Sequence, residues 1–346
     1  MNATMISSFG VVLLSSTFLH SADAHHSFRM HYDPDRSIVL QGVVAEVDLR
    51  SPHSFFFVDA PGEDGDVQRW EVEAASLVHL RRLGIHPDTF QPGDSITIDA
   101  WPNLVPNNPL IWGQAFTAAD GTRYGGPPTA DRADPGAQPT AGIERLAGRW
   151  LAPPPVTQTE SPLPLTDAGW DAWRNYDPQL SPANTCEPIS IPDLLYAPYL
   201  SSIEFREGEV FFHHEAYDIT RTVPLNGESR QAEPTGVLGT ASGRIEGDTL
   251  IVESSGYPPS AWGLGIAVHP NGSGADVPSS AQKTVVERYS IGEDDTMLVL
   301  EVTHEDPVYM REPYSGRIEY SRVSEDTPWY DYVCEVESAE RFSRDP

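Results

Sequence analysis

Hydrophobic and polar residues alternate along short stretches of this chain, and turns rich in Gly, Pro and Asp separate the stretches. Between Ser37 and Phe116 there are five such stretches, with one run of helical character from Ala74 to Leu83. Alternation with a period of two is typical of strands that bury one face. Five strands and one short helix in about 90 residues predict a small closed or partly open barrel of the OB type.

A second β-rich region begins near Cys186 and runs to Glu337. With weaker candidates included, we expect about eight antiparallel strands there, which must hide their edges, and an up-and-down barrel is the simplest way to do so. The predicted fold class is therefore all-β, a small barrel followed by a larger antiparallel one. The clearest strands of the larger barrel are Ile203–Phe205, Glu209–Glu215, Thr249–Glu253, Thr284–Ser290, Met297–Thr303 and Arg317–Val323.

The ends of the chain and the region between the barrels have their own composition. The apolar stretch Phe9–Leu19 and the small residues around Ala24 predict an export signal over residues 1–24, the alternative being a buried N-terminal strand. Pro and Gly without periodicity predict a linker with a short helical segment. The expected division is 25–124 for the first barrel, 125–185 for the linker, 186–337 for the second barrel and 338–346 for a tail.

Charge and composition exclude several classes of protein. There are 22 Lys and Arg against 51 Asp and Glu, a formal charge of −29, which repels phosphate backbones and argues against nucleic acid as a partner. The 32 Pro and 27 Gly make a helical bundle improbable. Beyond the leader no segment reaches about 18 consecutive apolar residues, so we expect no transmembrane segment in the mature chain.

The two cysteines, Cys186 and Cys334, bear on the compartment. In an exported protein an even number of cysteines favours a disulfide, and two reduced buried thiols are the alternative. The bridge would close a loop of 148 residues and contribute roughly 5 kcal/mol in the chain-entropy description. We therefore predict a periplasmic or secreted, acidic, disulfide-bonded protein.

Two stretches of the chain resemble known families. The start His25-His26-Ser27-Phe28, with Leu40-Gln41-Gly42, Ser51-Pro52-His53 and Gln91-Pro92-Gly93-Asp94, resembles the DUF6152 family of exported bacterial proteins over roughly residues 25–125. Residues 186–337 resemble the lipocalin-like half of uncharacterised bacterial proteins. In this half Ile245 replaces a usual aromatic residue and Ser279-Ser280-Ala281 replaces a His-Ser-Glu, so no role of that His-Glu pair transfers. Both resemblances imply architecture and no reaction.

A metal site is predicted at the mature N-terminus. After cleavage His25 would carry a free α-amine and an imidazole, which chelate a metal together, and a further imidazole completes a three-nitrogen site suited to copper. His53 is the first candidate for that imidazole, and His26 and His31 are alternatives. The competing interpretation is that these histidines are solvent-exposed or cap a docked N-terminus.

The second barrel offers two further hypotheses. His213 and Glu215 share one side of a predicted strand and could act as a general acid and base, in a hydratase or isomerase without cofactor. Alternatively, the barrel encloses a small hydrophobic molecule, or aromatic rings simply fill it. The residues expected to contact such a ligand are Arg244, Tyr257, Trp262, Arg288 and Tyr309. A binding protein, a copper-dependent oxidoreductase centred on His25 and His53, the acid–base enzyme and a structural envelope protein all remain open.

Overall fold

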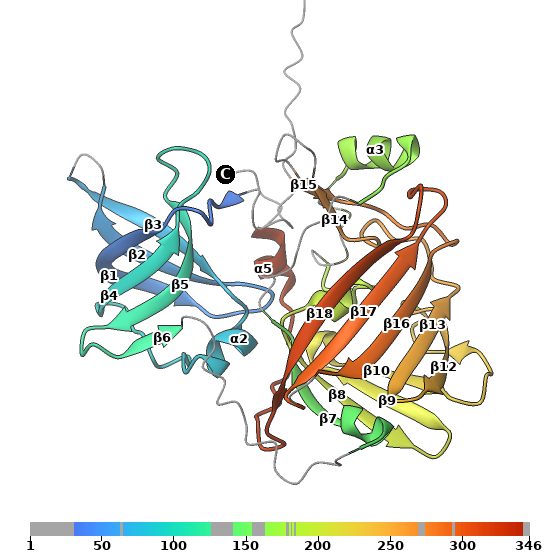
Figure 1. Cartoon of the computed structure of the whole chain (residues 1–346). Coiled ribbons are helices and arrows are strands. Elements are labelled where there is room, and N and C mark those ends of the chain that lie inside the picture. Colours follow the sequence, from blue (N-terminus) through green and yellow to red (C-terminus); the bar gives the residue numbers. More distant parts are fainter. Residues whose placement is uncertain are drawn as a thin grey trace, which may run out of the picture.

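The computed structural model describes residues 31–62, 65–125, 141–153, 163–177, 180, 182, 185–268, 274–292 and 295–341. Two separate β-structures account for most of them, one from the first third of the chain and one from the rest (Figure 1). The predicted export signal, His25 and His26 lie outside the described residues. None of the described helices is long and apolar enough to cross a membrane.

The first β-structure is a closed barrel of five strands, as predicted. Its strand order is β3-β2-β1-β4-β5, and a parallel pairing of β3 with β5 closes it, while the short β6 pairs antiparallel with β5. Helix α2 lies between β3 and β4 in the sequence, which is the OB-type arrangement expected from the pattern. The bounds are β1 Ile38–Asp48, β2 Ser54–Pro61, β3 Val67–Ala74, α2 Leu77–Arg82, β4 Ser95–Trp101, β5 Leu110–Ala118 and β6 Arg123–Gly125.

A small apolar core and one glycine hold this barrel closed. Phe56 is fully buried, and its ring centroid lies 4.6 Å from that of Phe116 on β5. Strand β1 pairs with β4 along its first half and with β2 along its second half. Gly42 lies where the pairing changes, and a Cβ there would approach the Asp59 carbonyl oxygen to 2.5 Å. Glycine is therefore required for the close approach of β1 and β2.

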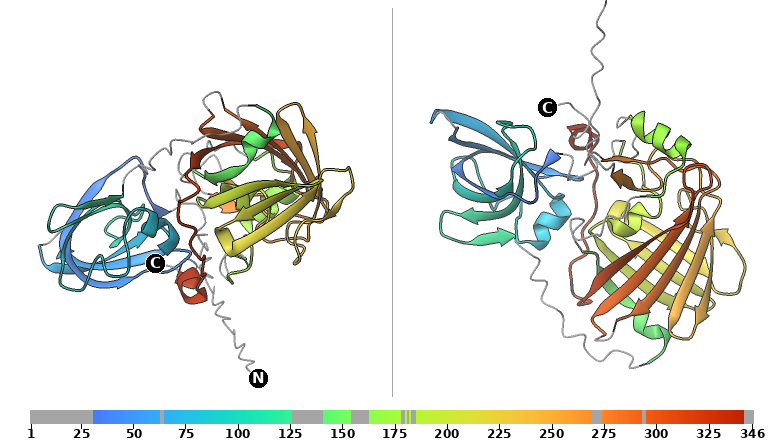
Figure 2. Two further views of the ribbon diagram at one scale, coloured as in Figure 1. Left: turned by 90° about the horizontal axis from the view of Figure 1, so that it is seen from below. Right: turned by 45° about the horizontal axis from the view of Figure 1, so that its top comes forward.

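The second β-structure is a ten-stranded antiparallel sheet rolled into a barrel (Figure 2). Its order β10-β9-β8-β7-β18-β17-β16-β13-β12-β11 joins strands that mostly follow one another in the chain, which is the predicted up-and-down arrangement. The bounds are β7 Gly148–Leu151, β8 Leu200–Arg206, β9 Glu209–His214, β10 Ile219–Pro224, β11 Arg230–Gln231, β12 Thr240–Glu246, β13 Thr249–Ser255, β16 Thr284–Ile291, β17 Met297–Glu305 and β18 Tyr314–Val323.

Strand β7 corrects the predicted division of the chain, because it comes from the stretch assigned to the linker. It pairs with both β8 and β18, and Trp150 at its centre is fully buried. Four residues beside a proline run are too few to show alternation, so the pattern could not reveal this strand.

On the other side of the sheet, the Thr222 N–H donates to the Ala232 carbonyl (2.9 Å) and brings β10 close to β11.

Short elements connect and cover the strands. They are the 3₁₀ turns η1 (Ile143–Leu146) and η4 (Ala216–Asp218), the helices α3 (Asp167–Arg174), α4 (Asp193–Tyr196) and α5 (Val336–Arg341), and the hairpin β14 (Ile266–Val268) with β15 (Gly274–Asp276). Helix α3 lies in the stretch for which a short helical segment was predicted. Helix α5 lies between the two barrels in Figure 1.

The C-terminal segment ties the two barrels together. Cys186 and Cys334 form the predicted disulfide, which anchors this segment. Immediately afterwards the Glu335 N–H donates to the Ser51 carbonyl of the first barrel (2.9 Å). The Ser338 hydroxyl then donates to the His53 carbonyl (2.8 Å). The segment that follows the last strand of the second barrel therefore holds the loop that precedes β2.

Candidate functional sites

A cluster of polar and aromatic side chains lies where the first barrel closes. His53 directly precedes β2, and Glu73 lies at the end of β3, opposite Phe55 on β2. The His53 Nδ1 is hydrogen-bonded to Glu73 Oε1, and the Tyr32 hydroxyl donates to Glu73 Oε2. Because the parallel register places Glu73 beside Trp112 on β5, closure of the barrel brings all four residues together.

The electrostatics of this cluster orient His53. An ionised carboxylate only accepts hydrogen bonds, so the contact with Glu73 assigns the proton to Nδ1 and the lone pair to Nε2. Burial, followed by the charge of Glu73, raises the pKa of Tyr32 well above its ordinary value. The Trp112 ring meets the His53 ring edge-on, with centroids 5.4 Å apart. A histidine held in this way by a buried carboxylate is the usual arrangement of a metal ligand.

The other predicted metal ligands are only partly within the described residues. His25 and His26 are outside them. His31 is buried next to Tyr32, and the two ring centroids lie 6.3 Å apart. Among the residues that the structure describes, no group of three or more His, Cys, Asp or Glu side chains could hold a metal ion. A metal at His53 would therefore need donors from outside the described residues.

The predicted acid–base residues do not share a site. Strand β9 ends at His214, and the chain then turns, so Glu215 leaves the strand. Glu215 is fully buried between the barrels, where it forms an ion pair with Arg82 and accepts the Tyr330 N–H (2.8 Å). His213 instead pairs with exposed Asp218 (2.7 Å) outside the barrel. Glu215 joins two domains in this structure.

Inside the second barrel lies an ion pair that the pattern analysis missed. Arg221 on β10 and Glu287 on β16 are both fully buried and joined by two hydrogen bonds of 3.0 and 2.6 Å. The Tyr289 hydroxyl also donates to Glu287. Arg221 lies on the same face of β10 as buried Ile219 and Val223. The alternation of residues along this strand was therefore a usable signal for an inward charge.

Aromatic and imidazole rings extend this group. The Arg221 guanidinium lies 5.0 Å from the centroid of the Phe212 ring, which is parallel to the His214 ring at 6.3 Å. His214, and not the predicted His213, faces the interior. Burial lowers the pKa of His214 to about 3, so its imidazole is neutral at neutral pH. Its Nδ1 is hydrogen-bonded to the Ser201 hydroxyl (3.0 Å).

Two buried nitrogens of this interior, His214 Nε2 and Arg221 Nε, lack a hydrogen-bonding partner among the described residues. The buried hydroxyls of Ser254 and Tyr257 lie close enough to interact with each other. Glu287 also lies close enough to Tyr257 to add to the effect of burial, which raises the pKa of the Tyr257 hydroxyl. Buried polar atoms without partners are costly and usually bind water or a ligand.

The only lysine of the chain, Lys283, is buried at one end of the same barrel. Its ammonium donates to the Ser190 hydroxyl (2.9 Å) and to the carbonyls of Ile191 (2.8 Å) and Gly263 (2.9 Å), and it lies 4.2 Å from the centroid of the Tyr257 ring. Burial lowers the pKa of Lys283 to about 7. The Ser190 hydroxyl donates its own proton to the Val237 carbonyl (3.2 Å), so its oxygen accepts from the ammonium. Each of the three N–H groups of the ammonium therefore has an acceptor.

The predicted ligand contacts are divided between the inside and the outside of the barrel. Tyr257 is buried in the core, and Trp262 packs against that core. Tyr309 packs in a separate apolar cluster. Arg244 is exposed and paired with Glu246 and Glu253, and Arg288 is exposed as well, so neither arginine points into the barrel. The buried arginine that could orient a ligand is Arg221.

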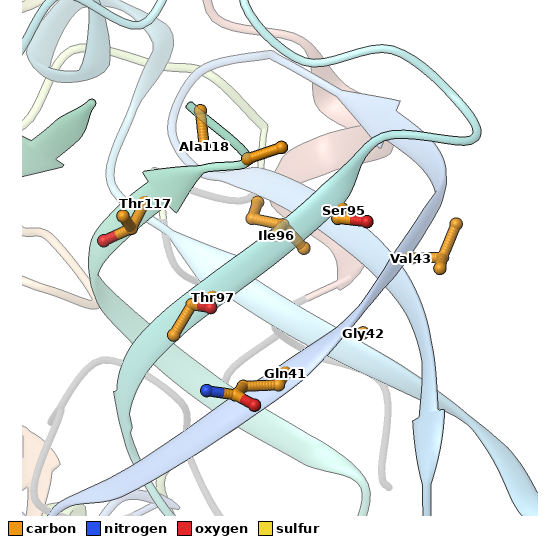
Figure 3. Close-up of a pocket in the computed structure, with 9 residues that line it drawn as sticks. Gln41, Gly42, Val43, Ser95, Ile96, Thr97, Thr117 and Ala118 are labelled. Atoms are coloured by element: carbon orange, nitrogen blue, oxygen red, sulfur yellow. The ribbon is translucent and has the colours of Figure 1, made fainter. Parts of the chain in front are cut away.

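A shallow groove of about 430 Å³ crosses β1, β4 and β5 on the outside of the first barrel (Figure 3). Its side chains are uncharged, with Gln41, Thr97 and Thr117 among them. The groove therefore has no acid, base or metal ligand of its own.

Comparison with known proteins concerns the first barrel. Residues 13–107 match DUF6152, a family of unknown function. The DUF6152 match includes His25, His26, His53 and Glu73, and it ends before the second barrel begins, so the lipocalin-like resemblance of that barrel stays a prediction. No curated protein and no solved structure matches the chain.

Proposed function

We propose that this protein is exported and binds copper at the first barrel through His25 and His53. The observation that carries the proposal is the hydrogen bond from His53 Nδ1 to buried Glu73, which orients the lone pair of Nε2 as in metal-ligating histidines. The disulfide supports an oxidising compartment, where a leader peptidase could expose His25.

Chain length is compatible with such a site. Five residues lie between His25 and His31, and a step of six positions spans at most about 20 Å in an extended chain. His31 already lies against Tyr32, which shares Glu73 with His53. A chain of this length supports a site in which the α-amine and imidazole of His25 join His53 Nε2 as ligands of one metal. Bound copper would supply a Lewis acid and a one-electron redox centre, held by nitrogen donors.

The proposal is tested on the protein purified from its native compartment. Mass spectrometry should give an N-terminus at His25, and metal analysis should give one copper per chain. His53→Ala should abolish the high-affinity site, and Glu73→Gln should weaken it by about ten- to a hundredfold. His213→Ala is the matched control, because that imidazole lies outside the cluster. Copper held equally well by His53→Ala, or a mature chain that begins elsewhere, would refute the assignment.

A second candidate function, binding of a small apolar molecule in the second barrel, is favoured by a different observation. The buried nitrogens His214 Nε2 and Arg221 Nε, which lack partners among the described residues, support a bound group that supplies their hydrogen bonds. Organic extraction of the natively purified protein, followed by mass spectrometry, should recover a stoichiometric small molecule. Ordered water alone at these atoms, in a high-resolution structure of the unextracted protein, would contradict this function.

A further inference from the structure

We infer that the ligand of the second barrel is an uncharged molecule with a hydrogen-bonding oxygen, an ester, ketone or alcohol, and not a fatty acid. This inference rests on the proposed binding function of that barrel. It follows from the buried positive charges of the interior, Arg221 and Lys283, both of which are already neutralised or saturated.

Arg221 cannot serve as the partner of a carboxylate. Its two terminal nitrogens each donate to Glu287, so its positive charge is already compensated by that carboxylate, and Nε lacks a partner among the described residues. A ligand carboxylate placed there would also lie close to the Glu287 carboxylate, which receives a further hydrogen bond from Tyr289. Like charges in a buried site repel strongly because no water screens them. The ion pair is therefore a neutral unit toward the ligand.

Lys283 is equally unavailable. Its ammonium has three N–H donors, and all three are taken by Ser190, Ile191 and Gly263. The face of the Tyr257 ring also lies against the Lys283 ammonium. An anion could bind only by displacing one of these contacts.

The atoms that remain suit a neutral oxygen. Arg221 Nε is a donor, the Tyr257 hydroxyl can donate or accept, and His214 Nε2 belongs to a neutral imidazole. Around them the interior is apolar, including Phe212, Val252 and Leu300. A carbonyl or hydroxyl oxygen on a hydrocarbon body satisfies these atoms without bringing a net charge into the barrel. A charged ligand would lose its hydration with no counter-ion to replace it.

Calorimetric titration of the extracted, full-length mature protein with probes of one chain length tests the inference. The probes are methyl octanoate, octanol, octanoate and octylammonium at about pH 7.5, where the last two are ionised. Methyl octanoate and octanol should bind more than about tenfold more tightly than either ion. Octanoate that binds as tightly as methyl octanoate would overturn the ligand class and leave the binding function standing. Failure of every probe would overturn both.

Two tyrosine variants connect the result to the interior atoms. Tyr257→Phe removes a buried hydroxyl whose neighbour is Ser254, so methyl octanoate should bind several-fold more weakly than to the wild type. Tyr320→Phe is the control, because its hydroxyl already donates to the Leu195 carbonyl (2.5 Å). It should lower the melting temperature and keep the preference for the neutral probe. Unchanged affinity in Tyr257→Phe would show that these atoms do not contact the ligand.

Discussion

The ion pair between Arg82 and Glu215 gives the sharpest test of how the two barrels are joined. Glu215 is fully buried, and only 11% of the Arg82 side chain is exposed. The Glu215 carboxylate also accepts the backbone N–H groups of Leu200 (3.3 Å) and Tyr330 (2.8 Å). The Tyr330 ring lies against the Arg82 guanidinium, 5.4 Å from its centroid. Replacement of Glu215 by Gln removes the negative charge and keeps the size of the side chain.

The expected loss can be worked from these contacts. Leu200 donates to Oε2 and Tyr330 to Oε1, so the single amide oxygen of Gln keeps one of these hydrogen bonds and its NH2 group faces the other N–H. Arg82 loses its counter-ion while it stays buried between the barrels. Breaking a buried ion pair by removal of one partner costs about 3–5 kcal/mol. Because one backbone N–H also loses its acceptor while Arg82 keeps slight access to water, we expect a loss of about 4 kcal/mol in the free energy of unfolding.

Urea unfolding monitored by tryptophan fluorescence, together with thermal unfolding monitored by calorimetry, measures this loss. The double variant Arg82→Gln, Glu215→Gln should be less destabilised than the sum of the two single variants, with a coupling of about 2 kcal/mol. His213→Ala, which removes a solvent-exposed ion pair, should cost less than about 1 kcal/mol. If Glu215→Gln unfolds within about 0.5 kcal/mol of the wild type, Glu215 does not join the barrels as described.

Three further predictions follow from buried or bridging groups. Cys334→Ser should lower the free energy of unfolding by roughly 5 kcal/mol, and dithiothreitol should reproduce this loss in the wild type without affecting the variant. Burial lowers the pKa values of His214 and His304 to about 3 and 4, below the ordinary 6.5. Only the unfolded chain then takes up their protons, so stability is lost as the pH falls from about 6.5 toward 4. Urea titrations of His304→Asn should show a shallower loss, and an equally steep one would contradict this account. Copper at His53 should quench the fluorescence of Trp112, and Trp112→Phe should show a smaller quench at equal copper occupancy.

Local patterns were sufficient for most of the architecture. Alternation of apolar and polar residues marked all five strands of the first barrel, and turn residues marked most strands of the second. The number and position of the cysteines predicted the disulfide between Cys186 and Cys334. These features are readable because the period of a strand, the residues of a turn and the count of thiols are properties of short segments.

Only the tertiary structure decided which polar side chains meet. The strand pattern placed His213 and Glu215 in one site, yet the turn after β9 brings Glu215 to Arg82 and leaves His214 facing inward. Glu73 was not recognised as the partner of His53, because the contact depends on the pairing of β2 with β3.

The same reason explains the remaining differences between pattern and structure. Arg221 and Glu287 are 66 residues apart, and only closure of the second barrel joins them. Strand β7 is too short to show a period, and it is fixed by β8 and β18 on either side. The sequence by itself thus determined the strands, their class of barrel and the covalent bridge. The partners of each buried charge were decided by strand register and barrel closure, which depend on contacts between distant segments.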